Sequence, residues 1–166
     1  MSLYLEDIPL GLTVELGQHT FTRDEIIDFA KRFDPQRFHM SEEGGRNSLF
    51  GGLCASGWHT ASVWLRLLID HRKRDADMML YRGERPARYG PSPGFEKIRW
   101  AKPVMVGDTI RFTTRAREKI PSRSRPEVGL LVSENEGFNQ NGDLVFAVLG
   151  KIFVEWRDKA DAPKRP

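Results

Sequence analysis

The chain has 166 residues, a formal net charge of +3 and one cysteine, Cys54. A chain of this length forms about one domain with a sizeable core, and a single cysteine excludes an internal disulfide. Acidic and basic residues are interspersed, which argues against a nucleic-acid partner, and no apolar run approaches the roughly 18–20 residues that span a bilayer. Because the N-terminus has no signal-peptide pattern, we expect a cytoplasmic protein that binds neither nucleic acid nor membrane.

The first predicted elements are a strand and a well-marked helix. Apolar and polar residues alternate over residues 13–21, which indicates a strand. Thr22 and Glu25 have the spacing of a capping box, and apolar residues then recur at helical intervals. The sequence therefore predicts a helix over residues 23–32, with Asp34 at its C-terminal end.

An acid and an imidazole follow this helix. Asp34 and His39 are five residues apart, and Pro35 lies between them. Proline biases the residue before it away from helical geometry, so the helix should stop there and the chain should turn or run extended. Both side chains can then converge on one spot, as acid–base chemistry requires. Residues 41–48 indicate one helical turn and then a loop.

A second helix is predicted over residues 57–72. The small residues Cys54-Ala55-Ser56-Gly57 precede it, and they allow a ligand to approach its N-terminal amides. Apolar residues cover most of its circumference, so we expect a buried helix, with Cys54 as a small core residue. The cations of residues 71–74 would lie in its last turn, near the negative end of the helix dipole. Glycine and proline then predict a long loop over residues 75–94.

The sequence pattern in the second half of the chain predicts antiparallel strands. Alternation of period two predicts strands over residues 97–101, 109–120, 128–137 and 144–156, and Asn141-Gly142 is a strong hairpin signal. Residues 158–166 are expected to form a disordered tail. Helices followed by a run of strands indicate an α+β domain in which one sheet face packs on the second helix.

Three motifs carry a resemblance to a known family. Phe-Asp-Pro-Gln-Arg-Phe-His, Phe-Gly-Gly-Leu-Cys-Ala-Ser-Gly-Trp-His-Thr and Lys-Pro-Val-Met-Val-Gly-Asp-Thr-Ile resemble the MaoC-like dehydratases, relatives of the R-specific enoyl-CoA hydratases. The resemblance implies a single hot-dog domain over residues 1–157, with a curved antiparallel sheet wrapped around a buried central helix. It also implies a homodimer with a joined sheet, and addition or removal of water at the double bond of an acyl-CoA.

The resemblance also implies roles for individual residues. Asp34 and His39 match the family's acid and base, and Gly57 matches the glycine whose amide receives the thioester oxygen. We group Ser56 and Gln36 with Gly57 as substrate-binding candidates. Well-characterised hydratases usually have asparagine where Gln36 stands, so the chain resembles an Asp-Pro-Gln subgroup. CoA enters as part of the substrate, and no further cofactor is expected.

A CoA ester carries phosphates, which need cationic partners. Arg123 and Arg125, in a loop between two predicted strands, are candidates for binding them. His19, His59 and His71 lack a ligand-like spacing with any carboxylate or cysteine, so no metal site is expected.

Three classes of function remain open at this point. The first is an acyl-CoA or acyl-carrier hydratase that uses Asp34 and His39 on one water. The second is a hot-dog thioesterase, in which a carboxylate activates water at the carbonyl carbon. The third is a non-catalytic acyl-binding subunit. The Asp34–His39 pair favours the first class, because a thioesterase needs only one acid and a binding subunit needs neither.

Overall fold

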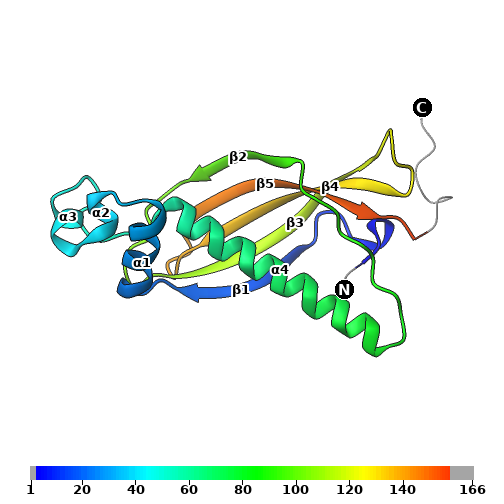
Figure 1. Cartoon of the computed structure of the whole chain (residues 1–166), viewed down its shortest axis with the longest axis horizontal. Coiled ribbons are helices and arrows are strands. Elements are labelled where there is room, and N and C mark those ends of the chain that lie inside the picture. The colour runs from blue at the N-terminus through cyan, green and yellow to red at the C-terminus, as the bar shows by residue number, and fades with distance from the viewer. Residues whose placement is uncertain (1–2, 158–166) are drawn as a thin grey trace.

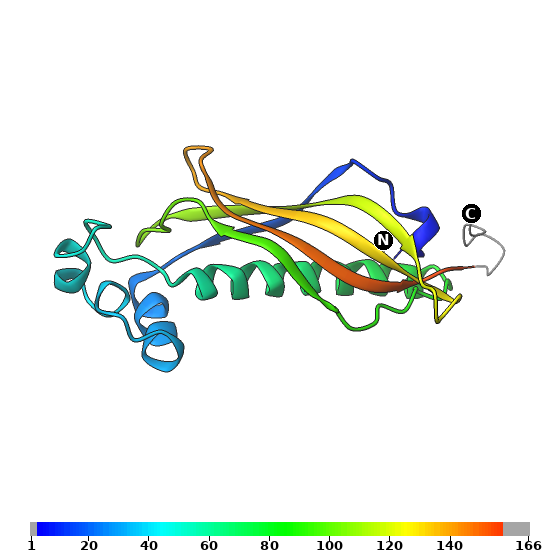
Figure 2. The same cartoon turned by 90° about the horizontal axis from the view of Figure 1, so that it is seen from above.

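The computed structural model describes residues 3–157. A 3₁₀ turn (Leu5–Asp7) comes first, and the order of the elements after it is β1 (Thr13–Thr20), α1 (Arg23–Phe33), α2 (Arg37–Met40), α3 (Glu42–Arg46), α4 (Gly57–Tyr81), β2 (Gly94–Trp100), β3 (Thr109–Pro121), β4 (Val128–Phe138) and β5 (Leu144–Glu155). The strands form one antiparallel sheet in the order β1-β3-β4-β5-β2. The sheet curves around α4, while α1, α2 and α3 cluster near the N-terminal end of α4 (Figures 1 and 2). The predicted α+β fold, a curved sheet around a central helix, is confirmed.

Capping and hydrophobic periodicity explain the first helix. The Thr22 side chain accepts a hydrogen bond from the backbone N–H of Glu25, as the capping box predicts. Ile26 and Ile27 then lie in the main core, and α1 ends at Phe33, immediately before Asp34. The predicted helix is therefore confirmed to within one residue of its C-terminal end.

One face of α4 packs against the concave face of the sheet. Trp64 and Leu68 belong to the main hydrophobic cluster, together with Phe112 and Phe146 of the sheet. The opposite face is exposed, because the sheet covers only one side of the helix; its large exposed apolar residues include Trp58, Leu65 and Ile69. The prediction that this helix is buried all round is therefore wrong for the single chain.

The helix is also longer than the sequence pattern indicates. α4 continues to Tyr81, so the prediction of a loop is wrong for residues 75–81, and the cations of residues 71–74 lie within the helix instead of in its last turn. Met79 explains the extension, because it is buried against Tyr4 and Ala87 in a small separate cluster. The chain leaves the helix at Gly83, which has a φ of +75° that favours glycine. Among residues 3–157, no helix has the length and hydropathy needed to cross a bilayer.

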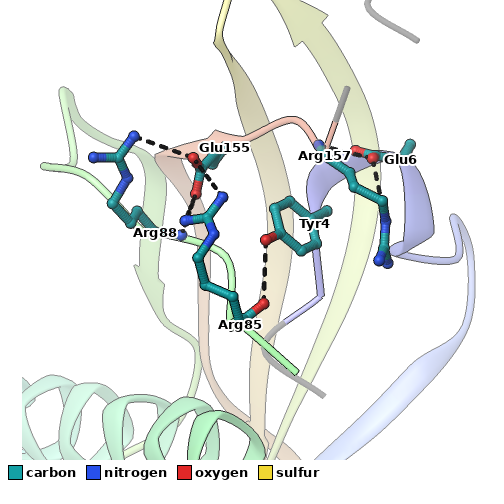
Figure 3. A network of polar contacts seen from close by, with 6 residues as sticks. All are labelled: Tyr4, Glu6, Arg85, Arg88, Glu155 and Arg157. Atoms are coloured by element: carbon teal, nitrogen blue, oxygen red, sulfur yellow. Dashed lines mark hydrogen bonds and ion pairs between the residues drawn. The ribbon is translucent and has the colours of Figure 1, made fainter. Parts of the chain in front are cut away.

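A polar network joins segments that are distant in sequence, at the end of the molecule opposite α1–α3 (Figures 1 and 3). Glu155, at the end of β5, is buried and accepts hydrogen bonds from both terminal nitrogens of Arg85 at 3.0 and 3.1 Å. Arg88 donates to the same carboxylate through its backbone N–H at 3.0 Å and its guanidinium at 3.1 Å. The Tyr4 hydroxyl donates to the backbone oxygen of Arg85 at 3.1 Å. The network therefore holds the N-terminus, the segment after α4 and the end of β5 together.

Candidate active site

Asp34 lies where α1 stops, with its carboxylate held in place by two donors. The backbone N–H of Asp34 donates to Ala30, and Asp34 itself has an extended φ of −153°. The Gln36 amide donates to Oδ1 at 2.8 Å, and the Ser56 hydroxyl donates to Oδ2 at 2.7 Å. Burial by itself would raise the pKa of Asp34, but the hydrogen bonds from Ser56 and Gln36 outweigh it and lower the pKa below its ordinary value. Asp34 is therefore ionised at neutral pH.

His39 reaches the same point from the short helix α2, which the sequence pattern does not predict. The chain turns at Pro35, where the backbone N–H of Gln36 donates to the backbone oxygen of Asp34 at 2.7 Å, and α2 then turns the buried His39 side chain inward. Nδ1 of His39 lies 2.7 Å from the backbone oxygen of Cys54. A carbonyl oxygen only accepts, so Nδ1 carries the proton in neutral His39. Nε2 then faces Oδ2 of Asp34 across 3.5 Å with its lone pair available.

Ser56 connects this pair to the start of α4. It is the N-cap of the helix, where its hydroxyl oxygen accepts from the backbone N–H of Trp58 at 3.2 Å. The same hydroxyl donates its only proton to Asp34, and Ser56 is almost fully buried. The geometry therefore gives Ser56 a contact with the Asp34 carboxylate, and its predicted role in substrate binding stays a prediction.

Gly57 is the first residue of α4, so its backbone N–H has no carbonyl acceptor within the helix. The Trp100 ring lies directly against it: a Cβ at position 57 would be 2.5 Å from the indole. Trp100 in turn packs edge-to-face on Trp58, with ring centroids 5.3 Å apart. Only glycine therefore lets the backbone and the Trp100 ring approach this closely.

These groups line one cavity of about 470 Å³. Asp34, His39, Ser56 and Gly57 form its polar part, and its other walls include Phe38, Phe50, Trp58, Trp100, Lys102 and Val104. A mostly apolar cavity with a few converging polar groups is the usual form of a small-molecule site. An ionised carboxylate, an imidazole lone pair and helix N-terminal amides can together activate a water and stabilise developing negative charge on an oxygen.

The sequence pattern identifies some members of this site and misses others. Asp34, Gln36, His39, Ser56 and Gly57, all predicted, do come together in the structure. Trp100, the last residue of β2, and Lys102, just after it, lie on the cavity wall but far away in sequence, and only the Lys-Pro motif beginning at Lys102 marks that segment. The contact between His39 and the backbone oxygen of Cys54, which orients the imidazole, could not be predicted from the residue type at position 54.

Two other predicted residues lie elsewhere. Arg123 and Arg125 are in the turn between β3 and β4, at the opposite end of the folded molecule from α1–α3 (Figure 1). The Arg125 guanidinium lies over the Phe153 ring, 4.7 Å from its centroid. Within one chain the pair does not reach the cavity, and a role in phosphate binding stays a prediction. Cys54 is buried as expected, and burial raises the pKa of its thiol to about 11.

The chain matches the family model of the MaoC like domain over residues 9–136. It belongs to the MaoC-like family. A MaoC-like dehydratase from Rhodospirillum rubrum is similar in structure, with a TM-score of 0.77, 32% identity, and coverage of 94% of this chain and 99% of that one. A 3-hydroxybutyryl-CoA dehydratase from Methylorubrum extorquens is 25% identical over 151 residues, which is 88% of this chain and 84% of that protein.

A solved structure of lower sequence identity shares the fold. The R-hydratase PhaJ1 from Pseudomonas aeruginosa has a TM-score of 0.62 at 16% identity, with coverage of 98% of this chain and 95% of that one. The hot-dog architecture expected from the motifs is therefore shared across these proteins.

Proposed function

We propose that this MaoC-like protein is a hydratase or dehydratase that adds or removes water at the double bond of a 2-enoyl thioester. The observation that supports this most directly is the pair of facing acid–base atoms, Asp34 Oδ2 and His39 Nε2, 3.5 Å apart on the cavity wall beside the start of α4. A water in the cavity in front of this pair can donate to both acceptors. The names of the relatives from R. rubrum, M. extorquens and P. aeruginosa agree with this class of reaction.

The proposed reaction uses each group once. In hydration, His39 Nε2 accepts a hydrogen bond from the water and orients it, and Asp34 takes one proton from that water as its oxygen bonds to C3. The same proton then passes from Asp34 to Nε2 of His39, which delivers it to C2. The product gains OH at C3 and H at C2, and both side chains regain their starting protonation. Negative charge that develops on the thioester oxygen is met by the Gly57 N–H and by the positive end of α4. Dehydration follows the same path in reverse.

A thioesterase is the second candidate, and the geometry favours it less. A thioesterase needs a single carboxylate that directs water at the carbonyl carbon, and Asp34 would suffice. The structure instead fixes the tautomer of a second group, His39, through the 2.7 Å contact with Cys54. A non-catalytic acyl-binding subunit would need neither this tautomer nor the lowered pKa of Asp34.

One experiment separates these classes. Purified protein is mixed with a four-carbon and a ten-carbon trans-2-enoyl-CoA, while the conjugated-enoyl absorbance and the release of free thiol are followed together. We expect loss of absorbance without thiol. Thiol release without absorbance loss would identify a thioesterase and contradict the proposal. With neither signal from the CoA esters, the same acyl groups on a carrier protein are tried, and a negative result there would leave a binding subunit.

We also propose that the active form is a homodimer. β2 is an edge strand of the sheet, and its large apolar residues Phe95, Ile98 and Trp100 are exposed, as are Leu65 and Ile69 on the open side of α4. An edge strand next to an apolar helix face suits pairing with a second copy, which would join the two sheets. Such a partner would also supply the cover that α4 lacks in the single chain.

A further inference from the structure

The wall of the active-site cavity includes a cation that the proposed reaction does not use. Among the described residues that line this cavity, Lys102 is the only lysine or arginine. It lies two residues after Trp100, the end of β2, whose ring touches Gly57. The Lys102 side chain is 54% exposed, and Trp58 and Trp100 on the same wall are 59% and 41% exposed. Residues that line a cavity and are about half exposed lie at its mouth, so Lys102 places a positive charge there.

The ion pair that Lys102 makes can be exchanged for another. Its ammonium lies 2.7 Å from Oδ1 of Asp143, in the turn between β4 and β5. Asp143 is held independently by Asn139: its backbone N–H donates to Oδ1 of Asn139 at 2.9 Å, and its Oδ2 accepts from Nδ2 at 3.4 Å. An ion pair between exposed groups contributes little to stability, and lysine has a flexible stem. An anion at the mouth of the cavity can therefore take the ammonium from Asp143 at little cost.

We propose that Lys102 binds the phosphate of the phosphopantetheine arm, the anion that CoA thioesters and carrier-protein thioesters share. This rests on the proposed function, which places the thioester oxygen at Gly57. The carrier stays in solvent, so the arm must leave the cavity through its mouth, where Lys102 lies. Lysine is a common partner of phosphate, and it acts there as a point charge that needs no fixed geometry.

The arm is long enough to reach Lys102. About thirteen bonds separate the thioester sulfur from the phosphorus, so the extended arm spans roughly 16 Å at about 1.25 Å of advance per bond. The Trp100 ring touches Gly57, and the Cα of Lys102 lies no more than roughly 7 Å from that of Trp100. The lysine side chain reaches roughly 6 Å further. The arm and this path are of similar length, so the phosphate and the ammonium can meet at the mouth.

The first test isolates the phosphate. The crotonyl thioesters of pantetheine and of 4′-phosphopantetheine differ in that group alone, and KM is measured for both. We expect KM to be about fivefold or more lower for the phosphorylated ester. Lys102→Met keeps most of the stem without the charge, and it should bring the two KM values to within about twofold, with a smaller change in kcat than in KM. Equal KM values in the wild type, or a preference that survives in Lys102→Met, would overturn the proposal.

Three further variants separate phosphate binding from a structural role of the ion pair. Lys102→Arg keeps a positive charge and should retain most of the preference. Asp143→Asn breaks the ion pair but leaves Lys102 charged, so the preference should persist; its loss would mean that the ion pair itself matters and would contradict the proposal. Lys97→Met is the matched control, because Lys97 is an exposed lysine of β2 that is absent from the residues lining the active-site cavity. An equal effect of Lys97→Met would reduce the role of Lys102 to general charge.

Two carriers can supply this phosphate, and their thioesters are compared next. The values of kcat/KM for crotonyl-CoA and for a crotonyl group on a carrier protein identify which carrier the enzyme uses. Lys102→Met should lower kcat/KM for both, because both contain the same phosphate. A loss with crotonyl-CoA but none with the phosphopantetheine ester would assign Lys102 to the nucleotide of CoA and overturn the assignment to the arm.

A binding measurement keeps this inference separate from the proposed function. Calorimetric titration with the saturated butyryl thioesters of pantetheine and 4′-phosphopantetheine requires no turnover. The phosphorylated ester should bind about fivefold or more tightly, and Lys102→Met should remove most of the difference. If no enoyl thioester is hydrated but this difference appears, the proposed function fails and the role of Lys102 stands. Equal binding of the two esters by the wild type would overturn the role of Lys102.

Discussion

The Ser56 hydroxyl donates to Oδ2 of Asp34 at 2.7 Å, across 22 residues of sequence. This bond ties the N-terminal cap of α4 to the C-terminal end of α1. It also places the carboxylate beside the first amide of α4, so the proposed base and the proposed oxyanion donor are held by the same residue. Ser56 is therefore a positioning residue for Asp34 in the proposed reaction.

The first prediction concerns the pH profile of Ser56→Ala. The bond from Ser56 lowers the pKa of Asp34, so its loss should raise that pKa. A base works only when it is deprotonated, so the acidic limb of the kcat profile should move to higher pH, with the largest loss of rate on the acidic side. Ser62→Ala is the control, because its exposed hydroxyl bonds only to Trp58 in α4. An unchanged acidic limb in Ser56→Ala would contradict this role.

The second prediction concerns the proposed acid–base pair. Asp34→Asn and His39→Gln should each lower kcat by roughly 10²–10⁴, the usual worth of a positioned acid or base. The double variant should lose little more than either single one, because both groups act on one water. Glutamine is chosen because its amide can still donate to Cys54, and circular dichroism checks the fold. Asp28→Asn, on the exposed side of α1, should keep full activity; multiplicative losses in the double variant would argue against a shared water.

The third prediction concerns the close approach at Gly57. Gly57→Ala keeps the backbone N–H but places a Cβ 2.5 Å from the Trp100 ring, so the ring or the helix start must move. We expect kcat/KM to fall by about tenfold or more, as small displacements at reacting groups usually cause. Adding Trp100→Ala should recover part of this loss by making space for the methyl group. A double variant that loses the product of the two single effects would show that the contact is not the cause.

The fourth prediction concerns stability in acid. Burial would raise the pKa of Glu155, but the bonds from Arg85 and Arg88 outweigh it and lower the pKa from 4.5 to about 2. A carboxylate with a lowered folded pKa adds stability above its unfolded pKa and loses it as the pH falls, here between 4.5 and about 2. Glu155→Gln should therefore lower the free energy of unfolding at pH 7 by about 1–3 kcal/mol.

Urea unfolding at several pH values measures this effect. The difference between wild type and Glu155→Gln should shrink below pH 4.5, where the wild-type carboxylate begins to lose its contribution. Glu84→Gln, exposed near the end of α4, is the control with an unchanged profile. A constant difference at every pH would mean that packing, and not charge, accounts for the effect of Glu155→Gln.

The fifth prediction concerns assembly. Sedimentation at micromolar concentration should show a species of twice the 19.0 kDa chain mass or an even multiple of it. Ile98→Glu, on the free edge strand β2, should shift the protein toward the monomer, because a buried charge is costly. Leu12→Glu, an equally drastic change beside the other edge of the sheet, should not. A wild-type species of only 19.0 kDa would contradict the dimer.

Local signals in the sequence determined most of the fold. The Thr22–Glu25 capping box and the break at Pro35 determine where α1 begins and ends, because both act through neighbouring backbone groups. Alternation of period two located β3, β4 and β5, since each strand has one face toward the core. The spacing of Asp34 and His39 and the resemblance of the motif at Gly57 likewise predicted these three residues as site candidates.

Tertiary contacts decided the rest. α4 continues to Tyr81 because Met79 is buried against Tyr4, a residue of the N-terminal segment that is far from the helix in sequence. The tautomer of His39 depends on the backbone oxygen of Cys54. Every residue has a backbone oxygen, so the residue type at position 54 does not predict this contact. Trp64 of α4 and Asn135 of β4 line one cavity only because the sheet curves under α4. Periodicity records which face of an element is buried, whereas these features depend on which distant segment that face meets.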